Sequence, residues 1–134
     1  MKQFIIVLTS VLLLVLCHCS CTKAPLPEVQ NSVKTIRFSL YTKDDFSGDN
    51  HNIIFSLFVR THTKVIFDST LSVMKIKDIP DSTHQLHFEK LIMTDSGPDL
   101  AAGFRYTIEN VGTASFIDSV SAADTFKIIH FIFK

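Results

Sequence analysis

The chain has 134 residues, of which 46% are hydrophobic and 19% are charged, a composition that suits one globular domain. Thirteen basic side chains balance thirteen acidic ones, so the formal net charge is zero. The sequence contains no basic stripe, which argues against nucleic acid as a partner. Its aromatic residues are twelve Phe, two Tyr and no Trp, a selection more typical of a core than of a surface that stacks bases or sugars.

The amino terminus has the pattern of an export signal. Lys2 supplies a positive charge, and an apolar stretch then runs from Phe4 to Cys17. This stretch is shorter than the roughly 20 apolar residues of a membrane-spanning helix and fits the range of about 7–15 in signal peptides. A buried core helix would need a polar face, whereas the stretch offers only Thr9 and Ser10. We therefore expect residues 1–20 to be a signal peptide.

Three cysteines and a histidine follow within LCHCSCTKAPLP, residues 16–27. They are too closely spaced to surround one zinc ion tetrahedrally, and the sequence has no second pair of cysteines. A disulfide between cysteines two or four residues apart would be strained and would join no distant parts of the chain. The interpretation that remains is a processing site.

This junction resembles the signal of bacterial lipoproteins, in which a small residue precedes a cysteine that becomes the lipid-bearing amino terminus. Ser20 precedes Cys21 and fits the small position, whereas Leu16 and His18 precede the other two cysteines. His18 also lies three residues before Cys21, where the family usually has an aliphatic residue. The resemblance implies lipidation, for example with palmitate, at Cys21 and a membrane as the first partner.

The domain boundaries follow from the composition after Cys21. The segment TKAPLPEVQNS contains two prolines and several small polar residues, as a tether does. We therefore expect a signal peptide at 1–20, a flexible tether at 21–32 and a folded domain at 33–134.

The domain shows the period of two that is typical of β-strands. Ile36, Phe38 and Leu40 fall on one face of the first segment, for example. No long window has a helical pattern, and the only helix-friendly piece, PDLAAG, is too short to count. We expect an all-β fold, an antiparallel β-sandwich of about eight strands that is immunoglobulin-like or related. Strands are expected at 33–42, 52–60, 64–69, 71–77, 84–93, 103–109, 115–120 and 125–134. The last is apolar on both faces, which predicts a central position in its sheet.

Candidate sites are few. The loop KDDFSGDN contains Asp44, Asp45, Asp49 and Asn50, whose oxygens are ligands that Ca²⁺ prefers, but its spacing is not that of an EF-hand. These four are weak metal candidates beside the simpler interpretation of a solvated turn. No nucleophile elbow, glycine-rich phosphate loop or other catalytic motif occurs. We therefore expect neither an enzyme nor a cofactor.

The segments IRFSLYTKDDFSGDN, IFDSTLSVMKIKDIPD and YTIENVGTASFIDS are similar to those of small bacterial lipoproteins of the Bacteroidota type. This resemblance implies a cell-envelope location at the outer membrane, on its periplasmic or its surface face. It supplies no activity, so Cys21 alone receives a functional role. The expected function is a lipid-anchored envelope protein with a non-enzymatic binding or accessory domain, whose protein or glycan partner is unknown. The alternative is a small envelope hydrolase or Ca²⁺-dependent ligand-binding protein that uses dispersed Asp and His residues.

Overall fold

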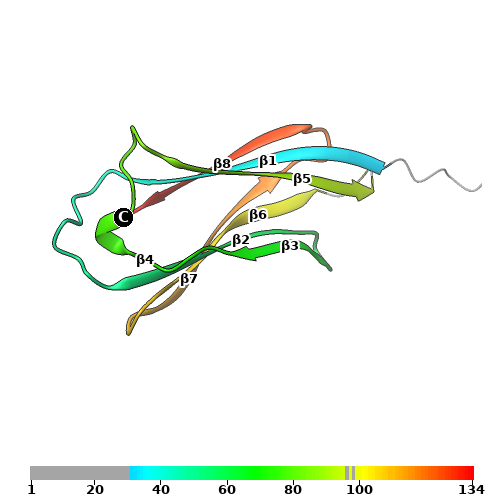
Figure 1. Ribbon diagram of the computed structural model, residues 1–134. Helices are drawn as coiled ribbons and strands as arrows, with labels where there is room; N and C mark the ends of the chain where they lie inside the picture. The colour runs from blue at the N-terminus through cyan, green and yellow to red at the C-terminus, as the bar shows by residue number, and fades with distance from the viewer. Residues whose placement is uncertain (1–30, 96, 98) are drawn as a thin grey trace, which may run out of the picture.

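The computed structural model describes residues 31–95, 97 and 99–134, and these form eight β-strands and one short 3-10 helix (Figure 1). In chain order they are β1 Asn31–Thr42, β2 Asn52–Arg60, β3 Val65–Thr70, β4 Met74–Lys75, η1 Ile76–Asp78, β5 Leu86–Asp95, β6 Leu100–Ile108, β7 Gly112–Val120 and β8 Phe126–Phe133. The prediction of an all-β fold with about eight strands is confirmed.

The predicted signal peptide, Cys21 and most of the predicted tether lie outside the described residues. Only Asn31 and Ser32 of the predicted tether, residues 21–32, are described. Both belong to β1, so the first strand begins two residues before the predicted domain boundary.

The strands form two sheets that face each other (Figure 1). The smaller sheet has the order β5-β1-β8, and the larger has the order β3-β2-β6-β7, with β4 paired to β2. Every pair of strands is antiparallel except β1 and β8, which run parallel. The predicted antiparallel sandwich is therefore confirmed, with one parallel pair that the sequence did not indicate.

The core lies between the sheets and is built from alternate residues, as the period of two predicts. In β1, Ile36, Phe38 and Leu40 are completely buried. Aromatic rings join the two sheets: the Phe38 and Phe104 rings meet edge to face at 5.6 Å, and the Phe104 and Phe131 rings stack at 5.2 Å. The eleven phenylalanines within the described residues thus serve the core more than the surface, because Phe126 alone among these eleven is strongly exposed.

The predicted central position of the last strand is wrong. Among the described residues β8 pairs only with β1 and forms an edge of the smaller sheet. Its inward residues Ile129 and Phe131 are buried in the core, whereas its outward residues Ile128 and Ile132 stay partly exposed. A strand that is apolar on both faces can therefore lie at an edge when its outer face is only half covered.

The predicted strand at 71–77 is also mostly wrong. Only Met74 and Lys75 form a strand, and the chain then turns through the 3-10 helix η1. Ile76 and Ile79 explain the difference, because both are nearly fully buried and hold the segment against the end of the sandwich. Backbone bonds fix it there: the Ile76 N–H donates to the His51 carbonyl at 3.0 Å.

Two smaller differences concern β3 and β6. The connection from β2 to β3 spans residues 61–64 instead of the three residues expected, and the Thr61 N–H donates to the Lys64 carbonyl at 2.8 Å. β6 begins at Leu100, so residues 100–103, the last four of the helix-friendly segment PDLAAG, are part of a strand.

The sandwich has two ends with different roles. We call the end at which β1 begins the entry end, because the chain from Cys21 arrives there; segments 61–64 and 121–125 also lie at this end. We call the opposite end the loop end. It is formed by segments 43–51, 71–85 and 109–111. In Figure 1 the entry end lies at the right and the loop end at the left.

Candidate functional site

The four metal candidates lie at the loop end but not at one place. Asp44 and Asp45 line a depression of about 350 Å³ together with residues of segment 77–84. Asp49 and Asn50 line a different depression of about 590 Å³. The loop 43–51 therefore divides its polar side chains between two surfaces.

Two carboxylates of this loop accept hydrogen bonds from its own backbone. Asp45 Oδ1 accepts a hydrogen bond from the Ser47 N–H at 2.9 Å, and Asp49 Oδ1 accepts one from the His51 N–H at 3.0 Å. These backbone N–H groups lower the pKa of each aspartate from its usual value. Such bonds are those of Asp residues that stabilise turns.

Within residues 31–95, 97 and 99–134 no group of three or more His, Cys, Asp or Glu side chains could hold a metal ion. The larger depression brings Asp49, His51 and Glu109 to one surface. The smaller one contributes Asp44, Asp45 and Asp81 with His84. In each case at least one carboxylate already accepts hydrogen bonds from its own turn.

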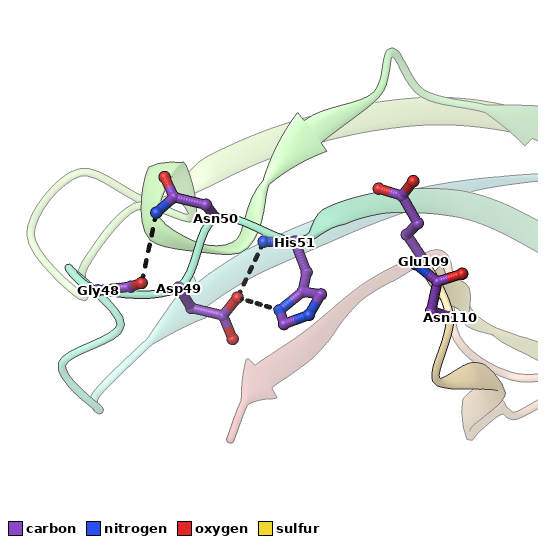
Figure 2. A pocket seen from close by; sticks show the side chains of 6 residues that line it. All are labelled: Gly48, Asp49, Asn50, His51, Glu109 and Asn110. Carbon is purple, nitrogen blue, oxygen red and sulfur yellow. Dashed lines mark hydrogen bonds and ion pairs between the residues drawn. The ribbon is translucent and has the colours of Figure 1, made fainter.

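Figure 2 shows how the larger depression is built from two distant parts of the sequence. Asp49 and His51 come from the loop before β2, and Glu109 and Asn110 come from the turn after β6. The pairing of Ile53 with Ile108 in the two strands brings the loop and the turn together. The sequence does not predict that the loop and the turn lie side by side, because the pairing of β2 with β6 produces this contact and no local motif does.

Two of the side chains in this depression, His51 and Glu109, are held by hydrogen bonds to neighbours. His51 Nδ1 lies 2.7 Å from Asp49 Oδ1; since a carboxylate only accepts, Nδ1 carries the proton. Asn52 Nδ2 donates to Glu109 Oε2 at 2.8 Å. Asn110 has a φ of 61°, a left-handed conformation that Asn tolerates, and it closes the turn into β7. The depression is wide and shallow and presents carboxylate, amide and imidazole groups that can hydrogen-bond a polar ligand.

Asp81 and His84 of the smaller depression form, with the neighbouring Thr83, an arrangement that resembles a catalytic triad. Asp81 Oδ1 accepts from Thr83 Oγ1 at 2.7 Å and from the Thr83 N–H at 2.8 Å. It also lies 3.1 Å from His84 Nδ1. The Thr83 hydroxyl gives its proton to the carboxylate, so it is not poised as a nucleophile that a base activates. The three residues form a turn.

We predict that this turn gives Asp81 a measurable pH dependence. The Thr83 hydroxyl, then the Thr83 N–H, then His84 lower the pKa of Asp81 from 3.8 to about 2. Because the folded-state pKa is depressed, the resulting stabilisation is complete above pH 3.8 and is lost as the pH falls through about 2. The carboxyl ¹³C resonance of Asp81 should therefore titrate with a midpoint near 2, and Thr83→Val should raise that midpoint. A wild-type midpoint near 3.8 would contradict the hydrogen bonding described.

The structure also places two histidines, His87 and His130, on either side of Ser39 in the smaller sheet. Ser39 in β1 pairs with His87 in β5 on one side and with His130 in β8 on the other. Ser39 is completely buried, and its hydroxyl donates to Gln85 Oε1 at 2.5 Å. The Ser39 hydroxyl is therefore neither exposed nor free, although the two histidines beside it are exposed.

Two further findings bear on the class of protein. Across the described part of the chain, none of the helical structure has the length and apolar character that crossing a membrane requires. Comparison with family models, with curated proteins and with solved structures gives no match to this chain.

Proposed function

We propose that the protein is a lipid-anchored module of the bacterial cell envelope that binds a partner through the loop end of its β-sandwich and performs no catalysis. The observation that carries the proposal is the placement of the two ends. The chain enters the sandwich at Asn31, whereas the depressions of about 590 and 350 Å³ that the loop 43–51 lines lie at the opposite end; two others, of about 460 and 220 Å³, lie at the entry end.

This placement suits presentation of the loops away from a membrane. Ten residue steps separate Cys21 from Asn31, which span at most about 35 Å when fully extended. β1 then carries the chain over twelve residues to the loop end, a length of roughly 40 Å. A lipid at Cys21 would thus hold the entry end near the bilayer and leave the loop end facing outward.

The side chains of the loop end favour binding over catalysis. The Thr83 hydroxyl and the Asp49 carboxylate are both engaged within their own turns. The depressions are shallow, and their polar groups are fixed by backbone bonds such as that from the Lys77 N–H to the Asp49 carbonyl at 3.1 Å. Fixed polar groups on loops that a rigid sheet supports are suited to hydrogen-bonding a protein or glycan surface.

The anchor is tested by labelling growing bacteria that express the full chain with an alkyne fatty acid. We expect the wild-type protein to carry the label and the Cys21→Ala variant to lack it, because the sulfur that accepts the lipid is removed. Cys17→Ala and Cys19→Ala are the matched controls and should keep the label. Label that persists in Cys21→Ala would show that Cys21 is not the anchor.

The binding role is tested in the same cells by placing a photo-crosslinking residue at Asn50 in the larger depression. Ser115, exposed on the outer face of β7, is the matched control position. We expect a discrete crosslinked product from position 50 and none from position 115. Equal products from both positions, or none from position 50, would contradict binding through the loop end.

A further inference from the structure

The outer face of the smaller sheet has an uneven distribution of apolar side chains. Along β5 the outward residues are His87 and Glu89 toward the loop end, then Leu91 and Met93, and finally Asp95 at the edge of the entry end. Leu91 is 63% exposed and Met93 is 75% exposed. The face is therefore polar in its middle, apolar at Leu91 and Met93, and polar again at its edge, where Asp95 pairs with Asn31.

Neighbouring strands extend this apolar region. Val33 pairs with Met93, and Thr35 pairs with Leu91 on one side and with Phe126 on the other. Val33 is 51% exposed and Phe126 is 47% exposed. We call the four side chains Val33, Leu91, Met93 and Phe126 the entry patch; they are half of the eight large hydrophobic residues that are strongly exposed in the described chain.

We propose that the entry patch rests on the lipid bilayer to which Cys21 is attached, so that the anchored domain contacts the membrane through the outer face of its smaller sheet. The inference rests on the proposed function, because the lipid at Cys21 brings the bilayer to this end of the molecule. Val33 lies only two residues into β1, and Leu91, Met93 and Phe126 lie beside it or one row further.

The charges around the entry patch are compatible with this contact. Arg37 is the nearest outward charge on β1, and its guanidinium donates to Glu89 Oε2 at 2.8 Å. The same guanidinium lies 5.4 Å from the centre of the Phe126 ring. The pair can stay at the level of the lipid headgroups while the apolar side chains reach the acyl boundary, as in other interfacial proteins.

A bilayer suits the entry patch better than a second copy of the chain does. A specific protein interface buries roughly 800 Å² on each partner, from about 20–30 residues, and four partly exposed side chains provide less. A lipid surface needs no matching shape. A tether also raises the effective concentration of the bilayer at the patch to the millimolar range, roughly, so that a weak contact is occupied.

The chain contains no Trp, so a single Trp reports on one position without interference. Leu91→Trp places the probe in the entry patch. Ile117→Trp is the matched control, because Ile117 is 48% exposed at a similar level along the sandwich but on the outer face of the larger sheet. Both sites are exposed enough to accept the larger ring, and circular dichroism of each variant should retain the β spectrum of the wild type.

Both variants are purified with their lipid and reconstituted into phosphatidylcholine vesicles with or without brominated acyl chains. We expect Leu91→Trp to emit at shorter wavelength on the vesicles and to lose about half of its intensity or more to the brominated lipid, while Ile117→Trp changes little. Equal quenching of both variants, or of neither, overturns the proposal. A shift to shorter wavelength without quenching also overturns it, because a second copy of the chain then covers the patch.

Mass spectrometry of the same samples separates this outcome from failure of the anchor. An acyl group on Cys21 with no quenching of Leu91→Trp rejects the membrane contact and leaves the anchor intact. If Cys21 carries no acyl group, the proposed anchor is rejected. The membrane contact of the entry patch is then rejected as well, because it depends on that anchor.

Discussion

Replacing Gly103 by alanine is expected to lower the free energy of unfolding by roughly 3 kcal/mol or more, the upper part of the range for overpacking. A Cβ at this position would lie 1.9 Å from the Phe116 carbonyl oxygen and 3.0 Å from the Ile117 Cα. Both atoms belong to the backbone of β7, so no side-chain rotation relieves the clash. The two strands would have to separate at the centre of the larger sheet.

The outer face adds a second reason for glycine at this position. Gly103 is the cross-strand partner of Phe58, which is 5% exposed although it points away from the core. Arg60 and Arg105 lie 5.7 and 5.8 Å from the centre of the Phe58 ring. An aromatic ring beside a strand glycine replaces the packing that the missing side chain would supply. Alanine would disturb this arrangement as well.

Gly48→Ala is the matched control, because no atom lies within 4 Å of a Cβ built at that position. We expect it to change the free energy of unfolding by less than about 0.5 kcal/mol. Urea unfolding followed by circular dichroism measures both variants against the wild type. A loss below about 1 kcal/mol in Gly103→Ala would show that β6 and β7 separate easily there.

The strands with a regular period of two were predictable because the signal is local. Ile36, Phe38 and Leu40 alternate with more polar residues, and one buried face is enough to produce that pattern. The turn at Asn110 was predictable for a similar reason, since Asn and Gly tolerate the backbone that a turn requires. Neither feature depends on which strand lies alongside.

Pairing between strands was not predictable from the same pattern. Nothing in the residues of β8 distinguishes a parallel edge strand from an antiparallel central one, because both need a buried inward face. The length of β4 was not predictable from the pattern either. Ile76 continues the alternation of 71–77, but its burial is satisfied by a 3-10 turn over the end of the core.

The candidate site shows why adjacency in sequence is a poor guide to adjacency in space. Asp45 and Asp49 are four residues apart, yet they line different depressions. Asp49 instead shares its depression with Glu109, which is sixty residues away and arrives through the register of β2 and β6. The carboxylates of Asp45 and Asp49 serve the turns of this loop, where each accepts a backbone N–H group.

Lys34 is the clearest case of a residue whose role only the structure reveals. It lies on the inward face of β1, in line with Ile36, and is 3% exposed. Its ammonium group donates to the carbonyl oxygens of Ser121, Ala122 and Asp124 at 3.0, 2.5 and 2.6 Å. All three donors of the group are thereby used. Lys34 thus fixes segment 121–125, which delivers β8 to its place beside β1.

Lys34→Met is therefore expected to lower the free energy of unfolding by about 3 kcal/mol, because three part-buried charged hydrogen bonds are lost and their carbonyl oxygens lose this partner. Methionine keeps an unbranched apolar stem, so the change isolates the ammonium group. Lys127→Met is the matched control; its ion pair with Asp118 is 3.2 Å long and partly exposed, and should contribute less than about 1 kcal/mol. Urea unfolding measures both variants, and amide hydrogen exchange should rise at Thr35, whose N–H donates to the Thr125 carbonyl. Equal losses in the two variants would mean that the three carbonyl contacts of Lys34 do not hold the segment in place.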